Sequence, residues 1–152
     1  MNLDKMVRRW RWIMTGVILL DLVCTFAGQP ASYWRDPTTG IEGNRLVKRI
    51  VVEGHLPFLL ASILYVSAVT WLVSITPRKL ALMGILGMIF GHYFGASTWL
   101  CYRFGIGVQG PILYGILLGI LLVSTGSNSP EINSADHHRK IDPPMPPINT
   151  DS

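Results

Sequence analysis

Charged side chains are scarce in this sequence of 152 residues: Asp, Glu, Lys and Arg make up 14% of it, and hydrophobic residues make up 49%. Soluble domains carry about a quarter charged residues, so this deficit favours a protein embedded in a membrane. The charges that remain, a net +4, gather at the ends of long uncharged runs, where basic residues meet lipid head groups. We therefore predict the lipid bilayer as a partner, and we find no pattern typical of nucleic-acid binding.

Motifs of the common enzyme and cofactor sites are also missing. The sequence contains no phosphate-binding loop of the Gly-x-x-x-x-Gly-Lys type, no Gly-x-Ser-x-Gly, no His-Glu-x-x-His and no Cys-x-x-Cys. The two cysteines, Cys24 and Cys101, match no metal-ligand spacing, and we interpret both as packing residues, with a disulfide as the alternative. The sequence therefore favours no catalytic residue, no metal and no other cofactor.

Four long apolar runs dominate what the sequence does contain. They cover about residues 12–28, 56–75, 80–100 and 108–125. A helix of about 20 residues, at 1.5 Å per residue, crosses a hydrocarbon core of roughly 30 Å. We predict an all-α fold, an integral membrane bundle of four transmembrane helices within residues 1–125. Residues 126–152 are rich in Ser, Asn, Asp and Pro, and we expect them to form a disordered cytoplasmic tail because they cannot bury a core.

The first apolar run has an alternative interpretation as a cleaved signal peptide. It begins after basic residues and ends at the small residues Ala27 and Gly28, as signal peptides do. Against this interpretation, Asp21 would lie in the middle of the apolar region.

The distribution of lysine and arginine predicts the orientation. Eight of the thirteen basic residues fall in the N-terminal segment, the turn at 76–79 and the tail, and five fall in the segments on the opposite side. Since cytoplasmic segments are the more basic, we predict a multi-pass protein of the cell inner (plasma) membrane with both termini cytoplasmic. The first outer segment ends in residues 44–49, three of which are basic, and we expect this end to lie along the interface as an amphipathic start to the second helix. Trp34, Trp71 and Trp99 are predicted to be interfacial anchors.

Glycines recur at helical spacing in the last two runs. The third run carries Gly84, Gly87, Gly91 and Gly95, and the fourth carries Gly115 and Gly119. A stripe of glycines lets another membrane helix approach closely. The pattern therefore predicts helix packing, either with other membrane proteins or by self-association.

An acidic residue and a histidine interrupt the apolar runs. From the helix rise, Asp21 lies about 14 Å and His92 about 18 Å from the predicted cytoplasmic ends of their helices. Ser62, Ser67 and Tyr114 are expected in the same layer. Ionisable groups at this depth need a partner inside the protein, so we predict that Asp21 and His92 pair. The pair either fixes the register of the helices or forms part of a proton relay or polar substrate path.

A second polar cluster is predicted near the outer surface. It comprises Glu42, Asn44, Glu53 and His55. Carboxylates and a histidine are metal ligands, but Glu53 and His55 lie about 200° apart on a helix and do not converge there. We interpret the cluster as polar residues facing solvent or head groups, and we predict no metal.

The order of several short motifs resembles a known family. The motifs are Leu19-Leu20-Asp21 with Thr25, then Glu42-x-Asn44-x-Leu46, and then Gly54 with Pro57-Phe58. Together they are similar to a family of small prokaryotic polytopic membrane proteins of unknown function. The resemblance covers about the first 60 residues and implies a helical membrane protein in which Asp21, Glu42 and Asn44 matter most.

These observations lead to one main functional hypothesis and two alternatives. The main hypothesis is a non-enzymatic accessory or assembly component that binds other membrane proteins through its glycine-rich helix faces. The first alternative is a subunit of a small transporter or channel that uses Asp21 and His92 as a polar path. The second is an intramembrane metalloenzyme built from Glu42, Glu53, His55 and His92.

Overall fold

The computed structural model describes residues 3–127 and is all-α, with four helices that are long and apolar enough to cross a membrane. The elements in chain order are α1 (Leu3–Ala27), the short 3-10 helix η1 (Pro37–Thr39), α2 (Arg45–Glu53), α3 (His55–Ile75), α4 (Arg78–Tyr102) and α5 (Gln109–Ser127). The four candidate spans are α1, α3, α4 and α5, which confirms the predicted fold class. Beyond residue 127, the predicted tail lies outside the described residues.

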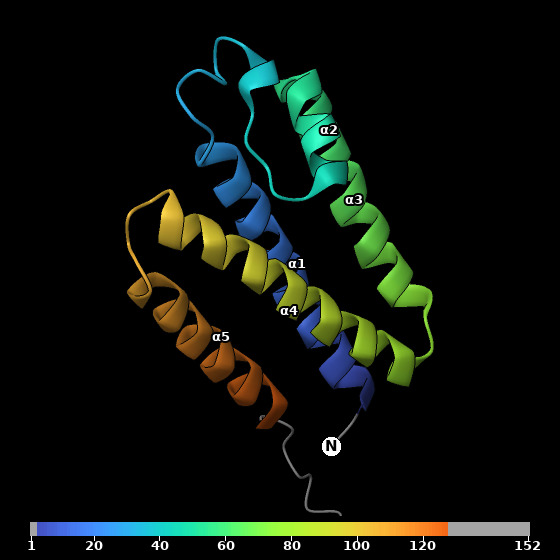
Figure 1. Cartoon of the computed structure of the whole chain (residues 1–152). Coiled ribbons are helices and arrows are strands. Elements are labelled where there is room, and N and C mark those ends of the chain that lie inside the picture. Colours follow the sequence, from blue (N-terminus) through green and yellow to red (C-terminus); the bar gives the residue numbers. More distant parts are fainter. Residues whose placement is uncertain (1–2, 128–152) are drawn as a thin grey trace, which may run out of the picture.

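The helices α1 and α4 cross each other and form the centre of the bundle (Figure 1). The helix α3 packs on one side of this crossed pair and α5 on the other. The N-terminal end of α1 and the C-terminal end of α5 lie at the same end of the bundle (Figure 1). This arrangement is the one that four successive crossings require, while the side of the membrane that this end faces stays a prediction.

The main core lies between α1 and α4 and is built from side chains at helical spacing. From α4 it takes Ala81, Ile85 and Ile89, which repeat every fourth residue, and from α1 it takes Met14 and Ile18. Most large apolar side chains outside this core are exposed. An outer surface of this kind is stable against lipid, and the hydrogen bonds within each helix satisfy the backbone polar groups of its interior.

The segment between α1 and α2 is held by a few buried polar contacts. The Gln29 side chain donates to the carbonyls of Thr25 and Ile41 over 2.9 and 2.8 Å and accepts from the Ile41 amide over 2.8 Å. The fully buried Tyr33 donates its hydroxyl to the carbonyl of Val51 in α2 over 3.3 Å. These contacts fasten the loop to the ends of α1 and α2.

Side-chain caps start the two short helices of this region. Asp36 begins η1 and accepts from the hydroxyl and the amide of Thr38 over 2.7 and 3.0 Å. These hydrogen bonds hold the pKa of the Asp36 carboxyl below its ordinary value. Asn44 begins α2 by accepting from the amides of Leu46 and Val47.

The basic segment that we predicted as the start of the second membrane helix is instead a separate helix. Residues Arg45–Glu53 form α2, which runs back alongside the first part of α3 (Figure 1). The chain reverses between the two helices at Gly54, whose φ of 131° is strained for any residue with a side chain. The basic side chains of α2 thus lie beside α3 rather than in line with it.

One predicted interfacial anchor is buried. Trp99 is only 8% exposed and packs with Cys24 and Ala96 where α4 meets the end of α1. Gly28 makes room for it, because a side chain at that position would collide with the indole ring. The prediction for Trp99 was therefore wrong, whereas Trp34 and Trp71 are exposed.

Candidate functional site

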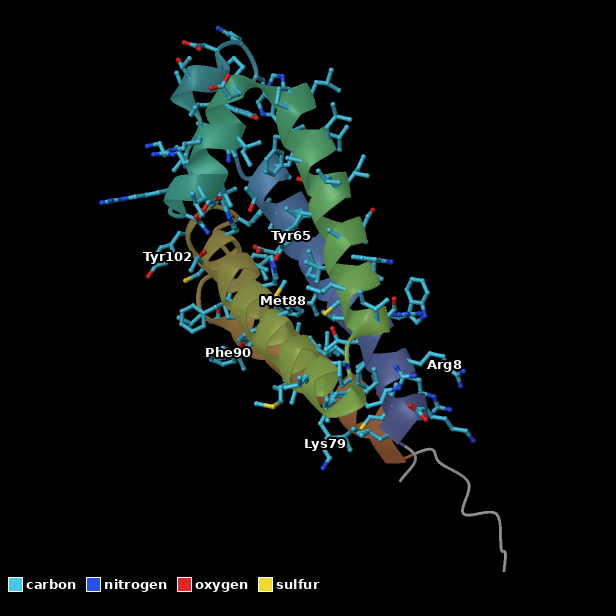
Figure 2. The ribbon with its side chains drawn as sticks, turned by 90° about the vertical axis from the view of Figure 1, so that its right-hand side faces the viewer. Arg8, Tyr65, Lys79, Met88, Phe90 and Tyr102 are labelled. Atoms are coloured by element: carbon cyan, nitrogen blue, oxygen red, sulfur yellow. The ribbon has the colours of Figure 1, made fainter. Side chains whose placement is uncertain are left out.

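A chain of three polar side chains connects three membrane helices near mid-depth. Nδ1 of His92 on α4 lies 2.7 Å from Oδ2 of Asp21 on α1, and Nε2 of His92 lies 2.8 Å from the Tyr65 hydroxyl on α3. In Figure 2, Tyr65 lies between α3 and α4 in the middle of the molecule. We call Asp21, His92 and Tyr65 the polar chain.

With Asp21 as a carboxylate and His92 as a neutral imidazole, the hydrogen bonds of the polar chain have one consistent set of donor and acceptor roles. A carboxylate only accepts, so the Nδ1–H of His92 donates to Asp21. A neutral imidazole then has its acceptor at Nε2, to which the Tyr65 hydroxyl donates. The Asp21 and His92 side chains are 16% and 18% exposed, while Tyr65 is 39% exposed and forms the outer end of the chain. The arrangement ties α1, α3 and α4 together and permits proton exchange along its length.

Gly95 makes the approach of Asp21 to α4 possible. A Cβ atom at this position would lie 2.7 Å from both carboxylate oxygens of Asp21. Gly95 is also one turn from His92 on the same helix, so the carboxylate can reach the imidazole only because the helix surface beside it is bare. Of the four glycines in the α4 stripe, Gly95 is the one that α1 contacts in this way.

The other glycines of the predicted stripe face open space. A Cβ at Gly84, Gly87 or Gly91 would meet no heavy atom within 4 Å of the described chain. On α5, Gly119 is likewise open, while Gly115 lies against the Tyr93 hydroxyl, which a Cβ would approach to 2.8 Å. Most of the glycine face of α4 is therefore not used for packing within the described part of this chain.

The remaining members of the predicted polar layer do not join the polar chain. The Ser62 hydroxyl donates to the carbonyl of Phe58 in its own helix over 2.8 Å, and Ser67 is exposed. The Tyr114 ring packs against Tyr93 with centroids 5.0 Å apart, and its buried hydroxyl has no hydrogen-bond partner among residues 3–127.

Tyr65 is the member of the polar chain that the sequence analysis missed. The signal was present, because Tyr65 lies between Ser62 and Ser67, at the depth already assigned to the layer. Depth alone does not give the direction in which a side chain leaves its helix. A tyrosine within an apolar run also looks like a residue that packs through its ring.

The outer polar cluster does not converge on a common centre. Glu42 accepts from the Asn44 amide over 2.8 Å, and Asn44 caps α2. His55 stacks on Trp34 with ring centroids 5.1 Å apart, and its Nε2 lies 3.3 Å from the Tyr33 carbonyl oxygen. Glu53 is exposed. Across the part of the chain that the structure describes, no group of three or more His, Cys, Asp or Glu residues is placed to hold a metal ion, so the metalloenzyme alternative has no ligand set there.

Comparison with known proteins adds no relative. The chain matches no known protein family, no curated protein and no solved structure. The resemblance of the first 60 residues to a family of small prokaryotic membrane proteins therefore stays a prediction.

Two cavities flank α1. One, of about 420 Å³, lies between α1 and α5 and is lined by apolar side chains apart from Tyr114. The other, of about 180 Å³, lies between the first turns of α1 and the turn from α3 to α4, and its lining is largely polar and charged. The first offers mainly apolar contacts to an occupant, whereas the second offers charge.

Proposed function

We propose that this small integral membrane protein is a non-enzymatic accessory or assembly component that binds another transmembrane helix through the glycine face of α4. We define this face by Gly84, Gly87 and Gly91. The partner helix belongs to another membrane protein or to a second copy of the chain. The observation that carries the proposal is the open space above all three glycines.

The chemistry of the α4 face fits a helix partner. Successive glycines three and four residues apart lie on one side of a helix and let a second backbone approach closely, which strengthens van der Waals packing in lipid. Apolar side chains flank the glycines: Met83 and Phe90 are highly exposed, and Figure 2 shows Phe90 projecting from α4. These side chains provide ridges beside the glycine groove, as in close membrane helix pairs.

The direction of the polar chain also favours an accessory role over transport. Counted from the turn between α3 and α4, Tyr65 and His92 lie about 15 and 21 Å along their helices. The chain thus runs mainly across the bundle. A proton or ion path needs groups that continue along the membrane normal, whereas groups at one level hold helices together.

The test is the assembly state of the purified protein. The wild-type chain is expected to leave the membrane in mild detergent together with a second helix-bearing partner or copy, detected by light scattering and mass spectrometry. Gly91→Leu is expected to remove at least about nine-tenths of this association, because a loss of about 1.4 kcal/mol of helix packing is tenfold. The fold should survive, because the position is open within the described chain.

The control places the same change on another helix. Gly119→Leu on α5 is also open within the described chain and is expected to leave the association intact. A wild-type protein that purifies alone as a monomer contradicts the proposal, and so does a Gly91→Leu variant with unchanged assembly.

A second candidate function is a subunit of an oligomeric transporter or channel. It is favoured by the exposure of Tyr65, which leaves the outer end of the polar chain on the surface where a neighbouring subunit would pack. Asp21→Asn keeps the shape of the side chain but removes its charge. If this function holds, the variant changes the pH dependence of flux in proteoliposomes; absent or unchanged flux removes the candidate.

A further inference from the structure

We propose that the cavity between the start of α1 and the α3–α4 turn binds the phosphate of an anionic lipid head group. We call this cavity the basic pocket. Its charged and polar lining residues are Asp4, Arg8 and Arg11 from α1, Ser74 from α3 and Arg78 from α4, and Val7 and Val73 complete it. The proposal is independent of the helix association described above.

The sequence spacing explains how the basic pocket forms. Asp4, Arg8 and Arg11 are four and three residues apart, so they lie on the same face of α1. This face meets the last turn of α3 and the first residue of α4, which supply Ser74 and Arg78. Its volume of about 180 Å³ is several times the roughly 30 Å³ that a water molecule occupies in the liquid.

The charges in the basic pocket do not balance. It contains three guanidinium groups and one carboxylate, and that carboxylate, on Asp4, is bonded to Arg78. Within residues 3–127, neither Arg8 nor Arg11 has a carboxylate partner. Counted over the described residues that line it, the pocket therefore carries an excess of two positive charges, which an anion would offset.

Arg11 provides the most specific evidence for a missing acceptor. Its Nε atom is buried and has no hydrogen-bond partner among the described residues. A buried donor on a charged group is costly when it is left unsatisfied. A phosphate oxygen would accept from it, and the planar guanidinium group suits phosphate well. The Ser74 hydroxyl already donates to the Trp71 carbonyl over 2.6 Å, so the arginines are the donors available to an anion.

The position of the basic pocket favours a lipid over a free anion. It lies at the ends of the membrane helices, close in sequence to the exposed Trp12 and Trp71, which mark the level of the head groups. Leu72 and Ile75 adjoin the pocket residues Val73 and Ser74 in the last turn of α3, and they are exposed apolar side chains that suit acyl chains. Basic pockets between membrane helices bind anionic head groups in this manner.

The test measures lipid selectivity with the full-length protein in detergent. Native mass spectrometry gives the ratio of the apparent Kd values for phosphatidylcholine and phosphatidylglycerol. The wild-type chain is expected to prefer phosphatidylglycerol. Arg8→Gln is expected to lower the preference about fivefold, and the double variant Arg8→Gln/Arg11→Gln about thirtyfold, from about 1 kcal/mol per basic residue.

The matched control is Lys79→Gln. Lys79 lies at the same end of the bundle as Arg8 but on the opposite side, and it does not line the basic pocket (Figure 2). The Lys79→Gln substitution removes one positive charge, as Arg8→Gln does, and is expected to leave the preference for phosphatidylglycerol unchanged. An equal loss of preference in Lys79→Gln would overturn the proposal, because it would indicate diffuse attraction of anionic lipid to all basic residues at this end.

Two further results would contradict the binding of an anionic lipid. No preference for phosphatidylglycerol in the wild-type chain overturns the proposal, and so does full competition by inorganic phosphate, which would identify a free anion as the ligand. If the double variant does not fold, the lipid preference is measured with two single variants. These are Arg8→Gln, at an exposed position, and Arg11→Lys, which keeps the charge. Arg11→Lys is expected to keep more of the preference than Arg11→Gln, because it keeps the charge and loses the guanidinium fork.

Discussion

His92→Leu is expected to lower the free energy of unfolding by about 3 kcal/mol, the largest loss that we expect from a single change in the polar chain. The substitution leaves the Asp21 carboxyl in the middle of the bundle without the imidazole that lies 2.7 Å from it. An aspartate near the centre of a membrane helix costs about 2.5–3.5 kcal/mol when nothing offsets it. The loss is measured by SDS titration in mixed micelles, followed by tryptophan fluorescence.

The double variant separates this cost from lost packing. Leucine is similar in shape to aspartate, so Asp21→Leu/His92→Leu replaces the pair with apolar groups and leaves no carboxyl unpaired. Replacing both partners of a buried hydrogen bond with apolar groups of similar shape is often nearly neutral, so the double variant should lie within about 1 kcal/mol of the wild type. If the double variant is as unstable as His92→Leu, the unpaired carboxyl is not the cause.

Tyr65→Phe, which removes only the hydroxyl at the end of the polar chain, should lower the free energy of unfolding by about 1 kcal/mol.

Gly95→Ala is expected to destabilise the bundle by about 2 kcal/mol, within the range of about 1–3 kcal/mol for overpacking. The new methyl group would lie 2.7 Å from both Asp21 carboxylate oxygens and 3.0 Å from the carboxyl carbon. Asp21 has a short side chain that is held by His92, so it can move aside only by giving up that hydrogen bond. The same SDS titration measures the effect.

The neighbouring glycine provides the matched control. Gly91 is one turn away on α4 and has no heavy atom near its Cβ position in the described chain. Gly91→Ala should therefore be neutral or slightly stabilising, since alanine exceeds glycine in helix interiors by roughly 0.5–1 kcal/mol. Equal losses at Gly91 and Gly95 would mean that contact with Asp21 does not distinguish the two positions.

The membrane helices were the most predictable part of the fold, because lipid imposes both their length and their composition. The start of α1 was not predicted. The apolar run begins at Trp12, but α1 begins at Leu3, because Met6 and Val7 pack inward while Arg8 and Arg9 are exposed. The charged residues therefore interrupted the apolar pattern, and about two further turns of α1 were not predicted.

The candidate site was predictable in depth but not in direction. Helix rise assigned Asp21 and His92 to one layer, and in the structure their side chains are 2.7 Å apart. The same arithmetic cannot show which glycine of the α4 stripe faces α1, because that depends on where the partner helix lies around α4. The burial of Trp99 was missed for the same reason: it faces Gly28, whereas Trp34 in the loop after α1 and Trp71 near the α3–α4 turn are exposed.

The partners of the polar chain are far apart in the sequence, and this has a consequence for synthesis of the protein. Asp21 precedes His92 by 71 residues. At roughly 5–20 residues per second, the ribosome needs about 4–14 s to reach the histidine after it has made the aspartate. During that interval the first helix carries an acid group into the insertion machinery before its partner exists. Until α4 is made, α1 therefore lacks the histidine partner of its acid group, and α3 is made in between, so the contact between Asp21 and His92 forms only when the third long apolar helix arrives.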